Sequence, residues 1–208
     1  MVFASREEAG RRLGHDLKAK GVQADIVLGL PRGGVVVAAE VAHVLNLPLD
    51  VLVVRKVGHP WHREFAVGAL AENGVVLFEE TLIGGNAAAR AALSDIVEEE
   101  RERLQEYVVR FHPRGPLELT DKLVLLVDDG LATGATTQAA VMAARRKSAR
   151  RVVVAAPVGS AHAVERLVRA ADEVCVLWVD AGFDAVGRYY AAFSQTTDEE
   201  VLGLLRVA

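Results

Sequence analysis

Residues 124–138 read Val-Leu-Leu-Val-Asp-Asp-Gly-Leu-Ala-Thr-Gly-Ala-Thr-Thr-Gln, and this stretch indicates the fold. It begins with four apolar residues in a row, continues through two acids and a loop of small residues, and ends in helix-forming residues. The pattern predicts a buried strand over Lys122–Val127 and a helix over Gly134–Lys147. A strand without polar alternation that leads into a helix is typical of a parallel sheet with both faces covered.

The same alternation of short apolar runs and helical patterns recurs on both sides of this stretch. Further strands are expected at Asp25–Leu30, Leu49–Val54, Arg151–Pro157 and Glu173–Val179. Helices are expected at Ser5–Lys20, Val35–Leu47 and Ser160–Ala170, the first of them opened by a capping box. The sequence therefore predicts one α/β domain over 1–208, a mostly parallel twisted sheet of about five strands with helices on both faces.

Three segments do not fit the alternation and are expected to be additions to the sheet. Gly58–Ala66 contains Gly and Pro without a period, which predicts a loop, and the Asn-Gly pair that follows predicts a hairpin, so that 58–78 forms a lid loop and hairpin. Residues 86–111 are charged and helix-favouring, which predicts a long helical insertion. The aromatic-containing tail 180–208 is expected to form a small C-terminal hood.

Composition excludes several classes of protein. The chain has 208 residues, a net charge of −4 and one cysteine, Cys175, within an apolar run. An acidic balance argues against nucleic-acid binding, and the apolar runs are too short to span a membrane. The N-terminal segment has no apolar signal core, and a lone cysteine forms no intramolecular disulfide, so a cytoplasmic location is expected. The outer face of helix 86–111 is either a homo-oligomer contact or simply solvated.

Residues 128–137 carry the chemistry. Gly130 and Gly134 permit a close backbone approach, while Thr133, Thr136 and Thr137 add hydroxyl donors. Backbone amides at the start of a helix, together with the helix dipole, favour a phosphate group there. The two preceding carboxylates only accept hydrogen bonds, which suits a vicinal diol or a divalent cation. A phosphate cradle beside a diol site describes a pocket for ribose 5-phosphate.

Two other kinds of protein also place acids at a strand end. A P-loop NTPase requires a G-x-x-x-x-G-K-[ST] loop, which the sequence lacks. A phospho-acceptor receiver domain does not require the glycine and threonine pattern behind the acids. Segment 124–138 instead resembles the phosphoribosyl pyrophosphate (PRPP) loop of type I phosphoribosyltransferases, and the resemblance covers most of the chain in order. It implies donor contacts at Asp128, Asp129, Gly130, Leu131, Ala132, Thr133, Gly134, Ala135, Thr136 and Thr137.

The resemblance also assigns cations. Pro31-Arg32-Gly33-Gly34 stands where the family has a short pyrophosphate loop, and a guanidinium such as that of Arg32 forks onto phosphate oxygens. Arg55 and Lys56 end the second predicted strand, where family members place pyrophosphate-binding cations, and at least one of them is expected to contact ligand. The implied catalytic set is Asp128, Asp129, Arg32 and Lys56. The implied cofactor is Mg²⁺, held mostly by the donor and water, with Asp128 and Asp129 as candidate protein contacts.

The implied reaction is displacement of pyrophosphate from the donor by a nitrogenous base. A third acid, which enzymes acting on 6-oxopurines usually carry three residues after the acid pair, is replaced here by Ala132, so a 6-oxopurine acceptor is disfavoured. In the lid, His59 and His62 are expected to be exposed rather than metal ligands, and no role is assigned to Trp61 or Glu64. In the hood, Phe183, Tyr189 and Tyr190 either stack on a base or pack. The alternative function is a PRPP-binding regulator without turnover.

Overall fold

The centre of the molecule is a five-stranded parallel sheet with the strand order β2-β1-β6-β7-β8. The computed structural model describes residues 2–83, 87–112 and 115–207. The five strands have these bounds: β1 Ile26–Gly29, β2 Leu49–Val51, β6 Leu123–Val127, β7 Arg151–Ser160 and β8 Glu173–Asp180. The predicted fold class and the parallel sheet are confirmed.

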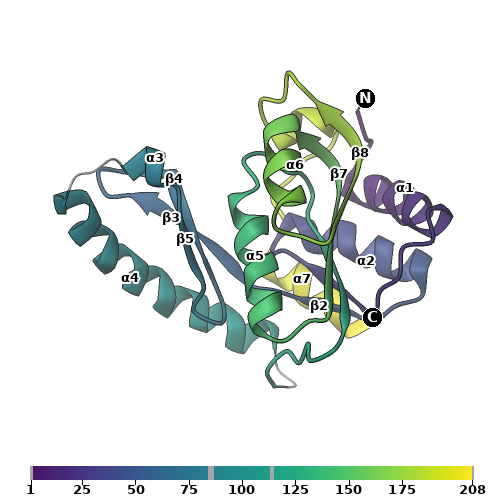
Figure 1. Cartoon of the computed structure of the whole chain (residues 1–208). Helices are drawn as coiled ribbons and strands as arrows, with labels where there is room; N and C mark the ends of the chain where they lie inside the picture. Colours follow the sequence, from purple (N-terminus) through teal and green to yellow (C-terminus); the bar gives the residue numbers. More distant parts are fainter. Residues whose placement is uncertain (1, 84–86, 113–114, 208) are drawn as a thin grey trace.

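Helices cover both faces of this sheet (Figure 1). On one face, α1 Arg6–Ala19 and α2 Gly33–Leu45 pack on alternate strand residues such as Val27, Leu125 and Val153. On the other, α5 Ala135–Arg146 and α6 Ala161–Val168 pack on the residues between them, such as Leu126 and Val154. Because successive strand side chains point to opposite faces, an unbroken apolar run serves both layers.

The strand order places a topological switch between β1 and β6. The chain leaves β1 through α2 toward β2 at one edge, and leaves β6 through α5 toward β7 and β8 at the other. The loops after β1 and β6 therefore diverge at the carboxyl edge of the sheet, where open α/β sheets bind their ligands.

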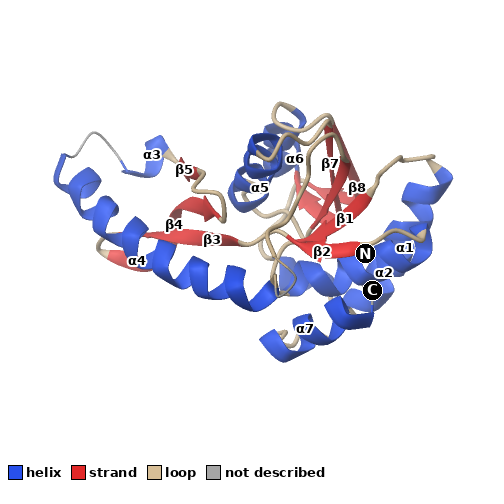
Figure 2. Ribbon diagram, turned by 90° about the horizontal axis from the view of Figure 1, so that it is seen from below, coloured by secondary structure: helices blue, strands red, loops and turns tan. Residues whose placement is uncertain are grey.

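An arm extends from this core, and it is built differently from the lid that the sequence pattern predicts. The arm consists of a three-stranded antiparallel sheet and two helices: β3 Val54–His59, β4 His62–Ala71, β5 Val76–Phe78, α3 Glu80–Ile83 and α4 Ala87–Phe111. Figure 2 shows α4 running along β3, away from the parallel sheet. Apolar side chains of β3 and β4, including Val57, Val67 and Leu70, pack on Leu93, Ile96 and Leu104 of α4.

The predicted loop over Gly58–Ala66 is wrong. Val54 pairs with Ala71 and His59 with His62, so β3 and β4 form a hairpin whose tip is Pro60-Trp61. Register shifts next to Gly58 produce the irregular polar pattern, and this is why no period is visible in the sequence. The hairpin predicted at Asn73-Gly74 is confirmed, with Gly68 opposite Phe78. The helix predicted from residue 86 is described from Ala87, because residue 86 lies outside the described part of the chain.

Two C-terminal features also differ from expectation. β7 does not end at Pro157 but continues to Ser160, because Val158, Gly159 and Ser160 pair with β8. The tail contains a 3₁₀ turn, η1 Val186–Tyr189, and a helix, α7 Asp198–Val207, that the pattern did not predict. Val201 of α7 is fully buried in the same cluster as α4 side chains, so tertiary packing supplies the stability that the local pattern does not reveal.

Candidate functional site

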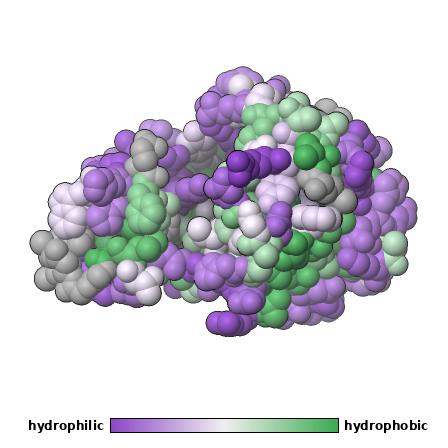
Figure 3. Space-filling view, turned by 90° about the horizontal axis from the view of Figure 1, so that it is seen from above, coloured by the Kyte–Doolittle hydropathy of each residue, from purple (hydrophilic) through white to green (hydrophobic). Residues whose placement is uncertain are grey.

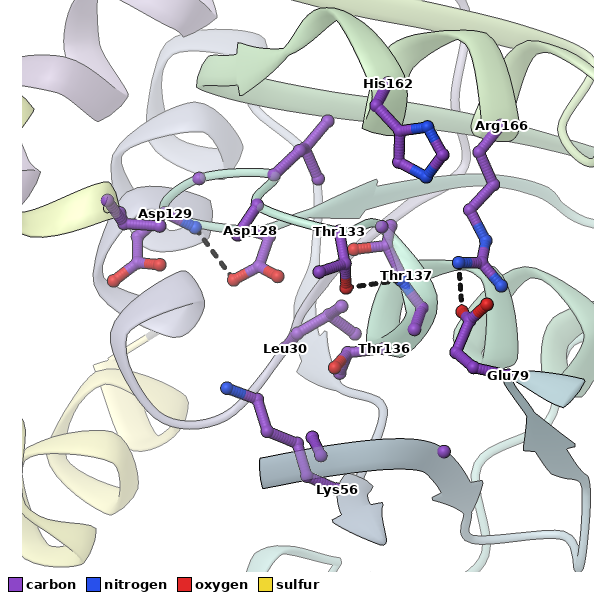
Figure 4. A pocket seen from close by; sticks show the side chains of 18 of the residues that line it. Leu30, Lys56, Glu79, Asp128, Asp129, Thr133, Thr136, Thr137, His162 and Arg166 are labelled. Carbon is purple, nitrogen blue, oxygen red and sulfur yellow. Dashed lines mark hydrogen bonds and ion pairs between the residues drawn. The ribbon is translucent and has the colours of Figure 1, made fainter. Parts of the chain in front are cut away.

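A cavity of about 490 Å³ opens at the carboxyl edge of the parallel sheet, beside the switch point. Its walls come from the loops after β1 and β6, from β3 and β4 of the arm, and from α6 (Figure 4). In the space-filling view hydrophilic side chains cover most of the face shown, and the surface is hollowed between the arm and the core (Figure 3). The cavity brings together these predicted residues: Arg32, Gly33, Lys56, Asp128, Asp129, Gly130, Leu131, Ala132, Thr133, Gly134, Ala135, Thr136 and Thr137.

The two acids follow β6 directly, and they differ in their surroundings. Asp128 faces the cavity, and its Oδ1 accepts a hydrogen bond from the Asp129 backbone N–H at 2.9 Å. Burial, followed by the charge of Asp129, raises the pKa of Asp128, while Lys56 opposes the rise. Asp129 is engaged by Arg6, whose Nε lies 2.7 Å from its Oδ2. The pair therefore offers the cavity acceptor oxygens on a rigid strand end.

The loop 131–134 is held in a fixed shape against the neighbouring strand and helix. Leu131 donates its N–H to Val158 O at 2.9 Å and accepts from Ser160 N at 2.9 Å. Gly134 has φ 76°, a left-handed conformation that disfavours a side chain, and a Cβ there would lie 3.3 Å from Ala163 Cβ. The first amides of α5 have no partner within the helix, and Ala135, Thr136 and Thr137 of this first turn line the cavity, so the positive end of the helix dipole lies beside it. This arrangement suits a phosphate group.

The loop after β1 meets the acids at its two glycines. The Pro31–Arg32 peptide is cis, and α2 begins at Gly33. A Cβ on Gly33 would collide with Asp129 Oδ2, and one on Gly34 would lie 2.9 Å from Asp128 Oδ1. The resemblance implies a pyrophosphate loop at these glycines, and the structure adds that their lack of side chains makes room for the carboxylates of the other loop.

Arg32 and Lys56 reach the cavity from two walls, the loop after β1 and strand β3. The Arg32 guanidinium lies 3.5 Å from Asp198 Oδ1, so the start of α7 partly neutralises it. Lys56 projects from β3 toward the loop after β6 (Figure 4). Both are exposed enough to meet a ligand, and a cation on each wall suits an elongated anion.

Arg55 is not brought to the cavity. Neighbouring side chains on a strand point to opposite faces, and Arg55 therefore faces α4, where its Nε lies 2.5 Å from Glu100 Oε2. Its guanidinium also lies 5.4 Å from the centre of the Tyr107 ring. The expectation of a ligand contact for Arg55 is not supported by this position, and of the pair only Lys56 lines the cavity.

Three charged or titratable residues of the cavity, His162, Arg166 and Glu79, were not anticipated from the sequence. His162 and Arg166 lie one turn apart on α6 and line the cavity, and Arg166 reaches toward Glu79 (Figure 4). Arg166 pairs with Glu79 of the arm and donates from Nε to Gln138 Oε1 at 2.5 Å. The sequence did offer a signal for His162 and Arg166. They are four positions apart in the helix that directly follows a predicted strand, and open α/β sheets bind ligands at the carboxyl ends of their strands.

Of the lid and hood side chains that the sequence singled out, those that the structure describes do not line the cavity. His59 and His62 pair across the hairpin with their ring centres 5.8 Å apart, next to the exposed Trp61, while the side chain of Glu64 lies outside the described residues. Tyr189 and Tyr190 are buried in a cluster with Phe3, and Phe183 stacks on Tyr189 at 5.2 Å. These aromatic side chains pack against one another.

The residues present are compatible with Mg²⁺ held largely by a ligand. Asp128 offers hard carboxylate oxygens to the cavity, which this ion prefers. No group of three or more His, Cys, Asp or Glu side chains gathers in a metal-binding arrangement within 2–83, 87–112 and 115–207. Among the same residues no helix is both long and apolar enough to cross a bilayer.

The fold and cavity define an α/β protein with an acid pair and a loop of glycines and threonines at the switch point. The family model for the phosphoribosyl transferase domain matches residues 6–186, and the chain belongs to that family. Two Mycobacterium tuberculosis proteins, from strains CDC 1551 and H37Rv, are named "Putative phosphoribosyl transferase" and are each 44% identical over 205 residues, or 98% of this chain. The chain spans 46% of their length.

Two solved structures are also similar. The protein TT1426 from Thermus thermophilus is 43% identical, with a TM-score of 0.81 over 99% of this chain and 98% of that one. The AQ2163 protein from Aquifex aeolicus is 13% identical, with a TM-score of 0.52 over 84% of this chain and 74% of that one. The second likeness shows the fold alone.

Proposed function

We propose that this chain transfers ribose 5-phosphate from PRPP to a nitrogenous base and releases pyrophosphate. The observation that carries the proposal is the convergence of three separate segments on one cavity. The acid pair follows β6, the glycine- and threonine-containing loop leads into α5, and two cations line the same cavity, Arg32 from the loop after β1 and Lys56 from β3. Family membership supports the same class of reaction.

The cavity suggests a specific order of contacts. The 5-phosphate fits the amides and hydroxyls of loop 131–134 and of the first turn of α5, because a helix N-terminus stabilises an anion. The ribose hydroxyls fit Asp128 and Asp129, which accept hydrogen bonds. Pyrophosphate fits between Arg32 and Lys56, where two cations stabilise the charge of the departing group. When bound, Mg²⁺ would add charge neutralisation at the pyrophosphate oxygens.

The arm supplies the cover in this proposal. Ala66 and Gly68 of β4 and Leu82 of α3 line the cavity, so the hairpin sheet forms one wall rather than a flexible loop. An apolar wall excludes water from the reacting carbon, which protects an oxocarbenium-like transition state from hydrolysis. At position 132 the cavity presents an alanine, so a 6-oxopurine acceptor is disfavoured for want of a proton-accepting carboxylate.

The test is pyrophosphate release from PRPP with Mg²⁺ against a panel of pyrimidine, purine and pyridine bases. Release that depends on one base, and that is lost in Asp128→Asn/Asp129→Asn, is expected. The matched control is Asp95→Asn, an exposed aspartate of α4, which should release pyrophosphate like the wild type. Thermal stabilisation by PRPP without release against any base would indicate a PRPP-binding regulator instead. Neither release nor stabilisation would overturn the proposal.

A further inference from the structure

A buried arginine at the start of α1 lies directly behind the acid pair. Arg6 is 9% exposed, although it stands in the first turn of a helix and the next residue, Glu7, is exposed. Its Nε donates to Asp129 Oδ2 at 2.7 Å, and its Nη1 donates to Ser194 O at 2.8 Å. The guanidinium carbon lies 3.9 Å from the centre of the Phe193 ring. A charged group is buried in this way only when its partners compensate for the lost hydration.

Asp129 is held from the same side by a second group. The Tyr190 hydroxyl donates to the Asp129 backbone O at 2.6 Å, and Tyr190 is itself buried. Phe3 forms an isolated parallel bridge with Tyr190, and Phe3 N donates to Tyr189 O at 2.7 Å. Segments near the two ends of the chain thus meet behind the acid pair, and we call residues 3–6 and 189–194 the terminal clasp.

The Arg6–Asp129 ion pair also lies against the loop after β1. A Cβ placed on Gly33 would collide with Asp129 Oδ2 and would come 2.7 Å from Arg6 Nε. The guanidinium of Arg6 therefore lies against three separate parts of the chain: Asp129, the loop that carries Arg32, and segment 189–194 of the terminal clasp. Its planar fork fixes the direction of each contact, which a flexible ammonium would not do.

We infer that Arg6 is a positioning residue of the donor site, one that fixes the Asp129 carboxylate between the phosphate-cradle loop and the loop after β1. The inference rests on the proposed function, because it treats Asp129 as a contact of the donor. It divides the acid pair by role. Asp128 faces the cavity, whereas the orientation of Asp129 is set by the terminal clasp, so donor affinity depends on a residue that does not line the cavity.

The experiment compares donor binding by the wild type, Arg6→Lys, Arg6→Met, Asp129→Asn and the double variant Arg6→Met/Asp129→Asn. PRPP affinity is measured by calorimetry with Mg²⁺, and the KM of the acceptor is measured in turnover. Arg6→Met should weaken PRPP binding about 10-fold or more, since it removes a charged hydrogen bond. Arg6→Lys should be intermediate because it keeps the charge and loses the fork. The double variant should bind no more weakly than the weaker single variant.

Two controls separate positioning from general damage to the fold. Arg11→Met removes a half-exposed cation of the same helix, paired with Glu40 at 3.3 Å, and should leave PRPP affinity unchanged. The acceptor KM should also stay unchanged in Arg6→Lys, whereas a merely loosened structure would alter both substrates. If Arg6→Met does not fold, Arg6→Lys carries the comparison.

The outcomes distinguish this inference from the proposed function. If folded Arg6→Met or Arg6→Lys binds PRPP as tightly as the wild type does, the inference alone is overturned. Additive losses in the double variant would also overturn it, because they would show that Arg6 does not act through Asp129. A wild type that does not bind PRPP overturns the proposed function, and the inference with it.

Discussion

The core and the arm use charged side chains for different purposes. In the core, Asp128 and Arg32 turn toward the cavity, and Lys56 joins them from the base of β3, so that a ligand can meet all three. Elsewhere in the arm, a charged pair fastens β3 to α4: Arg55 pairs with Glu100, whose side chain is 9% exposed. A charge at a strand end is therefore not by itself a site residue, because the face on which it emerges decides its role.

A buried cluster of charged groups fastens the arm at its base. His112, after α4, contacts Glu72 Oε2 at 3.2 Å and Asp50 Oδ1 at 3.4 Å, and its side chain is 3% exposed. Glu72 also accepts from Val53 N at 2.9 Å and lies 3.5 Å from Lys147 Nζ. This carboxylate connects the β4–β5 turn to the core sheet and to α5, so the joint between arm and core depends on it.

The largest expected effect is therefore on stability, through Glu72→Gln. The substitution leaves His112 and Lys147 without their buried counter-charge, and it should lower the free energy of unfolding by about 3–5 kcal/mol. Chemical denaturation measures the change. Glu118→Gln, an exposed glutamate, serves as the control and should unfold like the wild type. If Glu72→Gln lowers the free energy of unfolding no more than Glu118→Gln does, the cluster does not fasten the arm.

The same cluster predicts a dependence of stability on pH. Burial alone would lower the pKa of His112, but hydrogen bonds to Asp50 and Glu72 outweigh it and raise the pKa from 6.5 to about 9. A pKa raised in the folded state favours folding while the group is protonated, so the contribution is complete below pH 6.5 and is lost as the pH rises through about 9. Its size is about 3 kcal/mol.

Denaturation from about pH 6 to about pH 10 measures this loss. His112→Asn should be less stable at low pH and should lack most of the decline. The exposed His15→Asn should keep the wild-type profile. An undiminished decline in His112→Asn would assign the effect to other groups.

A neighbouring pair of cations gives an intermediate effect and contrasts the two regions most sharply. Lys56→Met should weaken PRPP binding about 10- to 100-fold and leave stability nearly unchanged, because it removes a charge facing the cavity. Arg55→Met should do the reverse and cost about 1–3 kcal/mol of stability, because among the described residues the buried Glu100 then keeps Arg103 alone as an ion-pair partner. Calorimetry of PRPP binding and chemical denaturation of both variants test this contrast. The contrast is wrong if both variants lose PRPP affinity alone or both lose stability alone.

The smallest expected effect lies at the outer end of the arm. Arg63 and Glu99 form an ion pair at 3.0 Å, but each side chain is half exposed. Solvent screens such pairs, so Arg63→Gln should change neither the denaturation midpoint nor PRPP affinity beyond experimental error. A clear loss of either property would show that the arm's surface contributes more than its exposure implies.

Local sequence patterns are enough to predict the sheet and most of the cavity. Unbroken apolar runs require burial on two faces, and the acids, glycines and threonines of 128–137 are contiguous, so neither prediction needs information from elsewhere in the chain. Such patterns also found the hairpin at Asn73-Gly74 and the capped start of α1.

The meeting of distant residues, in contrast, depends on tertiary structure. Arg6 and Asp129 are separated by 123 positions, and nothing near Arg6 in the sequence distinguishes it from a solvated helix residue. The sorting of Arg55 from Lys56 depends on the register of β3 against β4. Tertiary folding brings such distant groups together. The burial of a charged side chain is decided by all the elements packed around it, so no local sequence pattern encodes that burial.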